Sequence, residues 1–176
     1  MNDKKLKCIL GEDVLVLLQA QIEVEYNASV QYLAMASWAD AQKYMYAASF
    51  LYKQSEEERH HMLKIMHYVN NAGGHALAPK TTTGILDTFS SLKEVFLQAL
   101  QNEMHTTKAI HTLVDYCLVH KSFATFGFLQ WFVTEQIEEE ATARRNLDLF
   151  DLIPQEGIGL YEIDKAIGFA ANGKSV

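Results

Sequence analysis

Proline, glycine and cysteine are scarce in this sequence. Its 176 residues include only 2 prolines and 9 glycines, so few positions interrupt regular structure, and such a composition favours long helices. The 2 cysteines, Cys8 and Cys117, lie far apart in the chain, which argues against a disulfide scaffold and against a thiolate metal site. We interpret both as ordinary thiols and expect a cytoplasmic protein.

An excess of positive charge and long apolar runs are also absent. The formal net charge of -7 argues against the basic surface of a protein that coats DNA or RNA, and it suits a protein that attracts cations. No apolar stretch approaches the roughly 20 residues of a membrane span, and the first residues lack the pattern of a signal peptide. We expect neither a nucleic acid nor a membrane as partner. The length suits a single domain, residues 1–176.

Apolar residues recur at alternating steps of three and four along most of the chain, which is the pattern of helices that face a core. The predicted helices cover residues of about 11–39, 42–72, 89–118 and 123–151, with a shorter fifth helix over about 160–170. The first two helices, and likewise the third and fourth, are joined by only a few residues, so each pair must pack antiparallel. We predict an all-α four-helix bundle of two antiparallel hairpins with a long crossover, plus a short C-terminal fifth helix.

Each of the four long helices carries glutamate near the middle of its apolar stripe. These residues are Glu25, Glu58, Glu103 and the pair Glu135 and Glu139. A lone carboxylate in a dry core is costly, and a single one would indicate a rim position or a buried ion pair. Four helices with glutamate at similar depth, and no lysine or arginine on the stripes, indicate a bound cation instead.

The spacing of these glutamates brings them together. Glu58 follows Glu25, and Glu139 follows Glu103, after similar lengths of chain, so both hairpins place their carboxylates at about the same level. His61 shares the helix face of Glu58, because residues three apart are neighbours. Carboxylates with one imidazole suit iron or manganese, and several bridging carboxylates suit two ions held close together.

Di-iron carboxylate bundles follow a related plan, with one glutamate from each of two helices and Glu-x-x-His from each of the others. The second predicted helix has the full motif in Glu58-Arg59-His60-His61. The corresponding run on the fourth, EQIEEE from Glu135 to Glu140, has no histidine.

In these stretches the chain resembles a ferritin of the non-haem bacterial kind. The resemblance extends from about residue 15 to residue 167, and its most specific parts are residues 25–32, the run SEEERHHM that ends at Met62, and FLQWFVTEQIEEE over residues 128–140. It implies the ferritin-like form of the predicted bundle. The missing second Glu-x-x-His argues against a bacterioferritin-type fixed cofactor centre, and we expect no haem.

The resemblance also implies roles for individual residues. Glu25, Glu58 and His61 would form a first iron site, and Glu58 would bridge to a second site completed by Glu103 and Glu139, with Gln136 beside it. Tyr32 would be hydrogen-bonded to the site and able to give an electron. A third, looser iron site would map to Glu57, Glu135, Glu138 and Glu139.

The activity implied by the resemblance is that of a ferroxidase. Ferrous ions would be oxidised in pairs by dioxygen or hydrogen peroxide, and the ferric product would be stored as a mineral inside a hollow homo-oligomeric cage of about 24 subunits. A rubrerythrin-like di-metal oxidoreductase is one alternative, although that class normally adds a cysteine-rich iron domain. A starvation-type mini-ferritin is another, although it places metal ligands between subunits and lacks the fifth helix.

Overall fold

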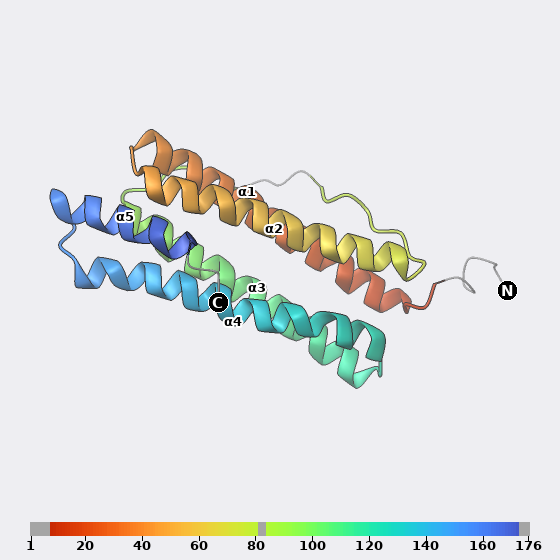
Figure 1. Cartoon of the computed structure of the whole chain (residues 1–176). Coiled ribbons are helices and arrows are strands. Elements are labelled where there is room, and N and C mark those ends of the chain that lie inside the picture. The colour runs from red at the N-terminus through yellow and green to blue at the C-terminus, as the bar shows by residue number, and fades with distance from the viewer. Residues whose placement is uncertain (1–7, 81–83, 173–176) are drawn as a thin grey trace.

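The computed structural model describes residues 8–80 and 84–172 and consists there of five helices. They are α1 (Glu12–Ala41), α2 (Met45–Asn71), α3 (Leu92–Val119), α4 (Phe123–Leu152) and α5 (Ile158–Asn172). Figure 1 shows α1 beside α2 and α3 beside α4, with the short α5 at one end of the bundle. The predicted four-helix bundle with a short fifth helix is confirmed. None of the helices in the described residues has an apolar stretch long enough to cross a lipid bilayer.

Two helices begin slightly later than the sequence predicts. α2 starts at Met45 rather than near residue 42, and α3 at Leu92 rather than near residue 89. Ser91 sets the start of α3, because its hydroxyl accepts a hydrogen bond from the backbone N–H of Glu94 at 3.2 Å. The Glu94 carboxylate in turn accepts from the backbone N–H of Ser90 at 2.6 Å, so side chains satisfy two otherwise unpaired donors at this helix end.

The ends of α1, α2 and α3 share one backbone geometry. In each, the second residue after the helix has a positive φ angle: 72° at Lys43, 85° at Gly73 and 58° at Lys121. The next residue then donates its N–H back into the last turn of the helix, as in a Schellman motif. These bonds join Tyr44 N to Ala39 O, Gly74 N to Val69 O, and Ser122 N to Cys117 O, at 2.8 to 3.0 Å. The geometry makes the two hairpin turns short, so α1 and α2, and α3 and α4, pack antiparallel.

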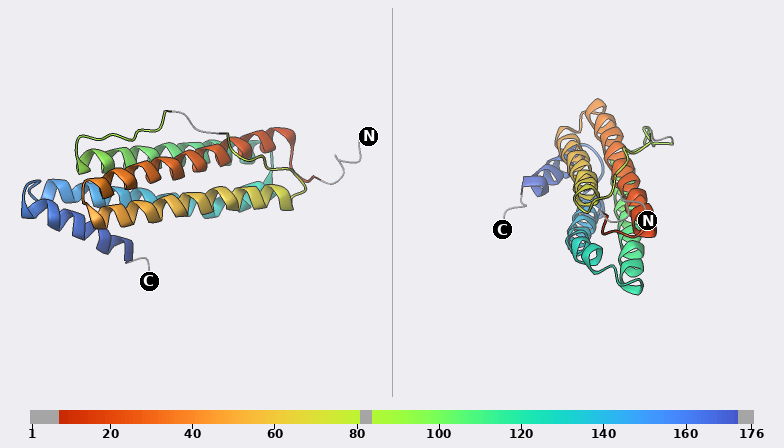
Figure 2. Two further views of the ribbon diagram at one scale, coloured as in Figure 1. Left: turned by 90° about the horizontal axis from the view of Figure 1, so that it is seen from above. Right: turned by 90° about the vertical axis from the view of Figure 1, so that its right-hand side faces the viewer.

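The crossover between α2 and α3 runs back along the length of the bundle (Figure 2). Two glutamines of α1 hold it in place. Gln19 donates to the carbonyl of Leu77 at 3.1 Å and accepts from its N–H at 2.9 Å, and Gln31 makes the same pair of bonds with Leu86 at 2.7 and 3.0 Å. Because the crossover returns to the starting end of α2, helices α2 and α3 run parallel.

The helix α5 docks on the beginning of α2. Asp164 is buried on α5 and accepts hydrogen bonds from the backbone N–H groups of Ala47 at 2.7 Å and Tyr46 at 3.4 Å. The residue before α2, Tyr44, provides no side-chain cap, so Asp164 supplies one from a distant part of the chain. Ile163 and Ile167 are fully buried beside it, which fixes α5 against the bundle.

The apolar core has two parts. The cluster at the α5 end contains Leu51, Phe96 and Phe150, and the cluster at the other end contains Ile22, Ile65 and Phe132. In all four long helices the buried glutamate lies between residues of the first cluster and residues of the second. A polar layer therefore crosses the bundle near its middle, with hydrophobic packing on both sides.

Candidate metal centre

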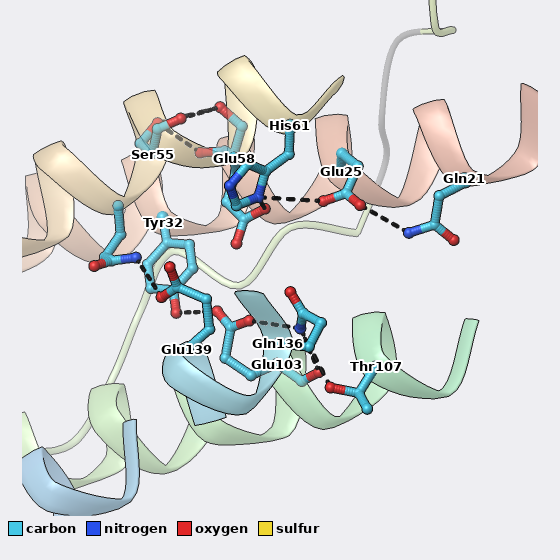
Figure 3. Close-up of polar contacts among 12 residues, drawn as sticks. Gln21, Glu25, Tyr32, Ser55, Glu58, His61, Glu103, Thr107, Gln136 and Glu139 are labelled. Carbon is cyan, nitrogen blue, oxygen red and sulfur yellow. Dashed lines mark hydrogen bonds and ion pairs between the residues drawn. The ribbon is translucent and has the colours of Figure 1, made fainter. Parts of the chain in front are cut away.

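The polar layer contains one buried glutamate from each long helix. Glu25 is 0% exposed, Glu58 1%, Glu103 1% and Glu139 2%. His61, on α2, is the one buried histidine, and the other six histidines are exposed. Figure 3 shows these side chains turned into the space between the helices. The sequence predicted that these side chains would meet, because both helix hairpins place their glutamates at about the same level of the bundle.

Three of these side chains form a compact group. Glu25, Glu58 and His61 each offer a ligand atom, and these atoms all lie within 4.8 Å of one another. His61 Nδ1 is 3.3 Å from Glu58 Oε2 and 3.9 Å from Glu25 Oε2. Gln21 donates to Glu25 Oε1 at 2.8 Å, whereas Glu25 Oε2 is buried without a hydrogen-bond partner. A buried carboxylate oxygen without a donor is costly, and a cation bound between these atoms would satisfy it.

Glu103 lies across the bundle and is held by neutral donors. The Tyr32 hydroxyl donates to Glu103 Oε1 at 2.5 Å, and Gln136 Nε2 lies 3.3 Å from Glu103 Oε2 (Figure 3). Gln136 Nε2 also lies 3.2 Å from the hydroxyl oxygen of Thr107. These contacts orient the Glu103 carboxylate and leave its negative charge uncompensated.

Glu139 is the fourth buried carboxylate. It accepts a hydrogen bond at 3.0 Å from Gln54 Nε2, which reaches across from α2. Gln54 is itself buried and precedes Glu58 by one helical turn. The donors that reach Glu25, Glu103 and Glu139 therefore include three amides and a phenol, all uncharged.

Burial and mutual repulsion raise the pKa values of three of the buried glutamates. Burial raises the pKa of Glu25 and of Glu58 well above the usual value, and a neighbouring carboxylate raises each further: Glu58 acts on Glu25, and Glu103 acts on Glu58. Burial also raises the pKa of Glu103 to about 7, although the hydrogen bond from Tyr32 opposes the shift. Near neutral pH the metal-free group holds protons that a cation would displace.

The pKa of Tyr32 is raised as well. Burial is the largest cause, and the negative charge of Glu103 adds to it. The phenol is only 2% exposed, so it stays protonated and keeps its hydrogen bond to Glu103.

Of the four residues expected at a third site, Glu139 lies in the buried layer and the other three lie nearer the surface. Glu57 on α2 and Glu135 on α4 are half-buried, and Glu138 is exposed. They lie outside the compact group of ligand atoms, which among the described residues contains Glu25, Glu58 and His61. Glu57 is close enough to raise the pKa of Glu58. The third site stays a prediction.

Sequence reasoning assigned no role to Gln21, Gln54 or Thr107. The first two are each four residues before a buried glutamate, at the spacing of neighbours on one helix face, and this spacing was the available signal. Thr107 follows Glu103 by four residues in the same way. The contact from Gln54 to Glu139 joins two helices and has no signal in the sequence.

Comparison with known proteins agrees with this fold. Residues 15–153 match the family model described as a ferritin-like domain. The chain is 38% identical over 159 residues to a bacterial non-heme ferritin of Campylobacter jejuni, covering 90% of this chain and 95% of that protein. It is 34% identical over 160 residues to a bacterial non-heme ferritin of Staphylococcus aureus, covering 91% and 96%.

Solved structures give the same result. The open-pore ferritin of the hyperthermophilic archaeon Archaeoglobus fulgidus superimposes with a TM-score of 0.86 at 31% identity, covering 90% of this chain and 96% of that one. Both the family match and the relatives span most of the chain. The chain belongs to the ferritin family.

Proposed function

We propose that this chain stores iron and oxidises it, as a ferroxidase that acts on ferrous ions bound inside a single subunit. The observation that carries the proposal is the layer of four buried glutamates and one histidine between two apolar clusters. Four buried carboxylates cannot all be ionised without an opposite charge beside them, and a bound cation would supply that charge. All of these side chains come from one chain, which disfavours a mini-ferritin site shared between subunits.

The first iron would bind to Glu25, Glu58 and His61. Two carboxylates and one imidazole are hard to borderline ligands that suit ferrous and ferric iron. Their ligand atoms are already within 4.8 Å of one another, so binding needs little rearrangement.

The second iron would bind between Glu58, Glu103 and Glu139, with Gln136 beside it. Glu58 is suited to the bridging role because the charges of both Glu103 and Glu139 act on it. Two adjacent ferrous ions can deliver two electrons together to dioxygen or hydrogen peroxide, which limits the release of one-electron products. The looser third ion would bind to Glu57, Glu135, Glu138 and Glu139.

Tyr32 is placed to give one further electron. Loss of an electron from the phenol also releases its proton, and Glu103 Oε1 lies 2.5 Å away to accept it.

Storage needs a container, and we infer one from the relatives. Proteins named bacterial non-heme ferritin match nearly the full length of this chain. We propose that about 24 copies assemble into a cytoplasmic cage that holds the ferric mineral.

The test is a titration of the metal-free protein with ferrous iron in air, following ferric absorbance. We expect a fast phase that saturates near roughly two or three ions per chain, followed by slower mineral growth. Size measurement on the same sample should give a large closed assembly. Oxidation no faster than in buffer, or a protein that stays monomeric or dimeric under all conditions, would contradict storage by a ferroxidase.

A further inference from the structure

A groove lies between α3 and α4, on the side of the bundle away from α1 and α2. It consists of two adjoining cavities that share the lining residues Thr107, His111 and Glu140. The inner cavity, of about 310 Å³, extends to Gln136 and is also lined by Val133 and Ile137. Neither the fold nor the proposed iron ligands account for this groove.

The floor of the groove is in direct contact with the metal centre. Gln136 lines the inner cavity, and its Nε2 atom lies 3.3 Å from Glu103 Oε2 and 3.2 Å from the Thr107 hydroxyl (Figure 3). One amide side chain therefore separates the groove from the proposed second iron. Its hydrogen bonds, including one to the backbone carbonyl of Glu103 at 3.3 Å, are all longer than the usual 2.9 to 3.0 Å.

The charges of the groove do not favour a cation. Two basic and two acidic side chains line it, Lys108 and Arg144 against Asp115 and Glu140, and Arg144 forms an ion pair with Glu140. Such a balance gives no net field to draw in ferrous iron. Val133 and Ile137 add an apolar wall beside Gln136. The carboxylates Glu57, Glu135 and Glu138 are not among its lining residues.

We propose that this groove admits the oxidant, a small uncharged molecule such as dioxygen or hydrogen peroxide, and that the Gln136 amide is the side chain that moves to let it pass. The proposal rests on the proposed function. It gives the two substrates different routes: the oxidant reaches the second iron from the α3–α4 side, and ferrous ions do not use that groove.

A second cavity offers a competing route and a matched control. It lies between α1 and α3, where Ala28 and Thr106 each lie one helical turn beyond a buried glutamate. Exposed His105 lines this cavity, and exposed His111 lines the groove, so the same helix carries one histidine at each entrance. Replacing either by tryptophan fills one entrance while changing only a surface position.

The experiment loads the metal-free assembly with about two ferrous ions per chain without oxygen and then mixes it with increasing dioxygen, or with hydrogen peroxide in a second arm. We expect His111→Trp and Ile137→Trp each to lower the slope of rate against oxidant concentration several-fold. His105→Trp should match the wild type. Anaerobic titration with Co(II) should show unchanged metal binding in all three variants. A lower slope in the two groove variants, with either oxidant, supports entry through the groove and identifies the oxidant that enters there.

Three results would overturn the proposal. The oxidant slope could be unchanged in both groove variants, it could fall only in His105→Trp, or Co(II) binding could fall together with oxidation in the groove variants. In each case a fast phase in the wild type would leave the ferroxidase proposal standing. A wild type without any fast phase would remove both proposals.

Discussion

Replacement of Glu58 by glutamine should abolish the fast phase of ferrous oxidation. Glu58 is 1% exposed, and its Oε2 atom lies 3.3 Å from His61 Nδ1. Burial raises its pKa well above the usual value, and the charges of Glu103 and Glu139 on the opposite helices raise it further. Its carboxylate is the proposed bridge, so Glu58→Gln weakens both iron sites at once while keeping the size of the side chain. Loss of a residue that only orients a metal ligand lowers metal affinity or activity by about 10- to 100-fold. Glu58 is itself a proposed ligand, so we expect the rate of the fast phase to fall by about 100-fold or more.

Glu56→Gln is the matched control, because Glu56 is exposed on the same helix two residues earlier. It should keep the rate and the extent of the fast phase. Stopped-flow absorbance after mixing each metal-free protein with ferrous iron in aerated buffer measures both quantities. Equal fast phases in the wild type and Glu58→Gln would mean that iron is not oxidised at a site bridged by Glu58.

Glu103→Gln should stabilise the metal-free protein at neutral and alkaline pH. Burial raises the pKa of Glu103 to about 7 in the folded state, against an ordinary value of 4.5. The folded state therefore holds this proton more tightly than the unfolded state, and the wild type loses stability as pH rises from about 4.5 through about 7. The full effect is on the order of 3 kcal/mol per chain. The variant lacks this titration, and its amide oxygen can still accept from Tyr32.

Thermal unfolding of both proteins at several pH values, with chelator present, measures the effect. The difference in Tm should be small near pH 4.5 and should favour Glu103→Gln increasingly up to pH 8. Glu156→Gln, at an exposed position, is the control and should follow the wild type. Saturating Co(II) should stabilise the wild type more than Glu103→Gln, because a ligand stabilises the state that binds it. A wild type that is more stable than Glu103→Gln at pH 8 without metal would contradict the buried-charge account.

The helical stripes made the fold predictable. Each stripe is long and periodic, and the short joins at Lys43 and Lys121 required antiparallel pairs. The positive φ angles at these lysines were not predicted, because glycine is the usual residue there and its absence hides the motif. The contact from Asp164 to the start of α2 was also missed, since it joins residues 117 positions apart.

The sequence located the polar layer but not its hydrogen bonds. Glutamates at equal depth predicted that Glu25, Glu58, Glu103 and Glu139 would meet, and the structure places all four in one buried layer. Periodicity fixes which face a residue occupies, but it does not fix which partner a side chain chooses across the bundle. The bond from Gln54 to Glu139 depends on that choice and became visible only in three dimensions.

We propose that two ferrous ions bind between the carboxylates of this layer. Anomalous diffraction from crystals soaked in ferrous iron without oxygen, measured on both sides of the iron edge, tests it most directly. We expect two strong peaks in each chain, one among Glu25, Glu58 and His61 and one between Glu58, Glu103 and Glu139. No peak inside the layer, with iron only at surface carboxylates, would contradict it.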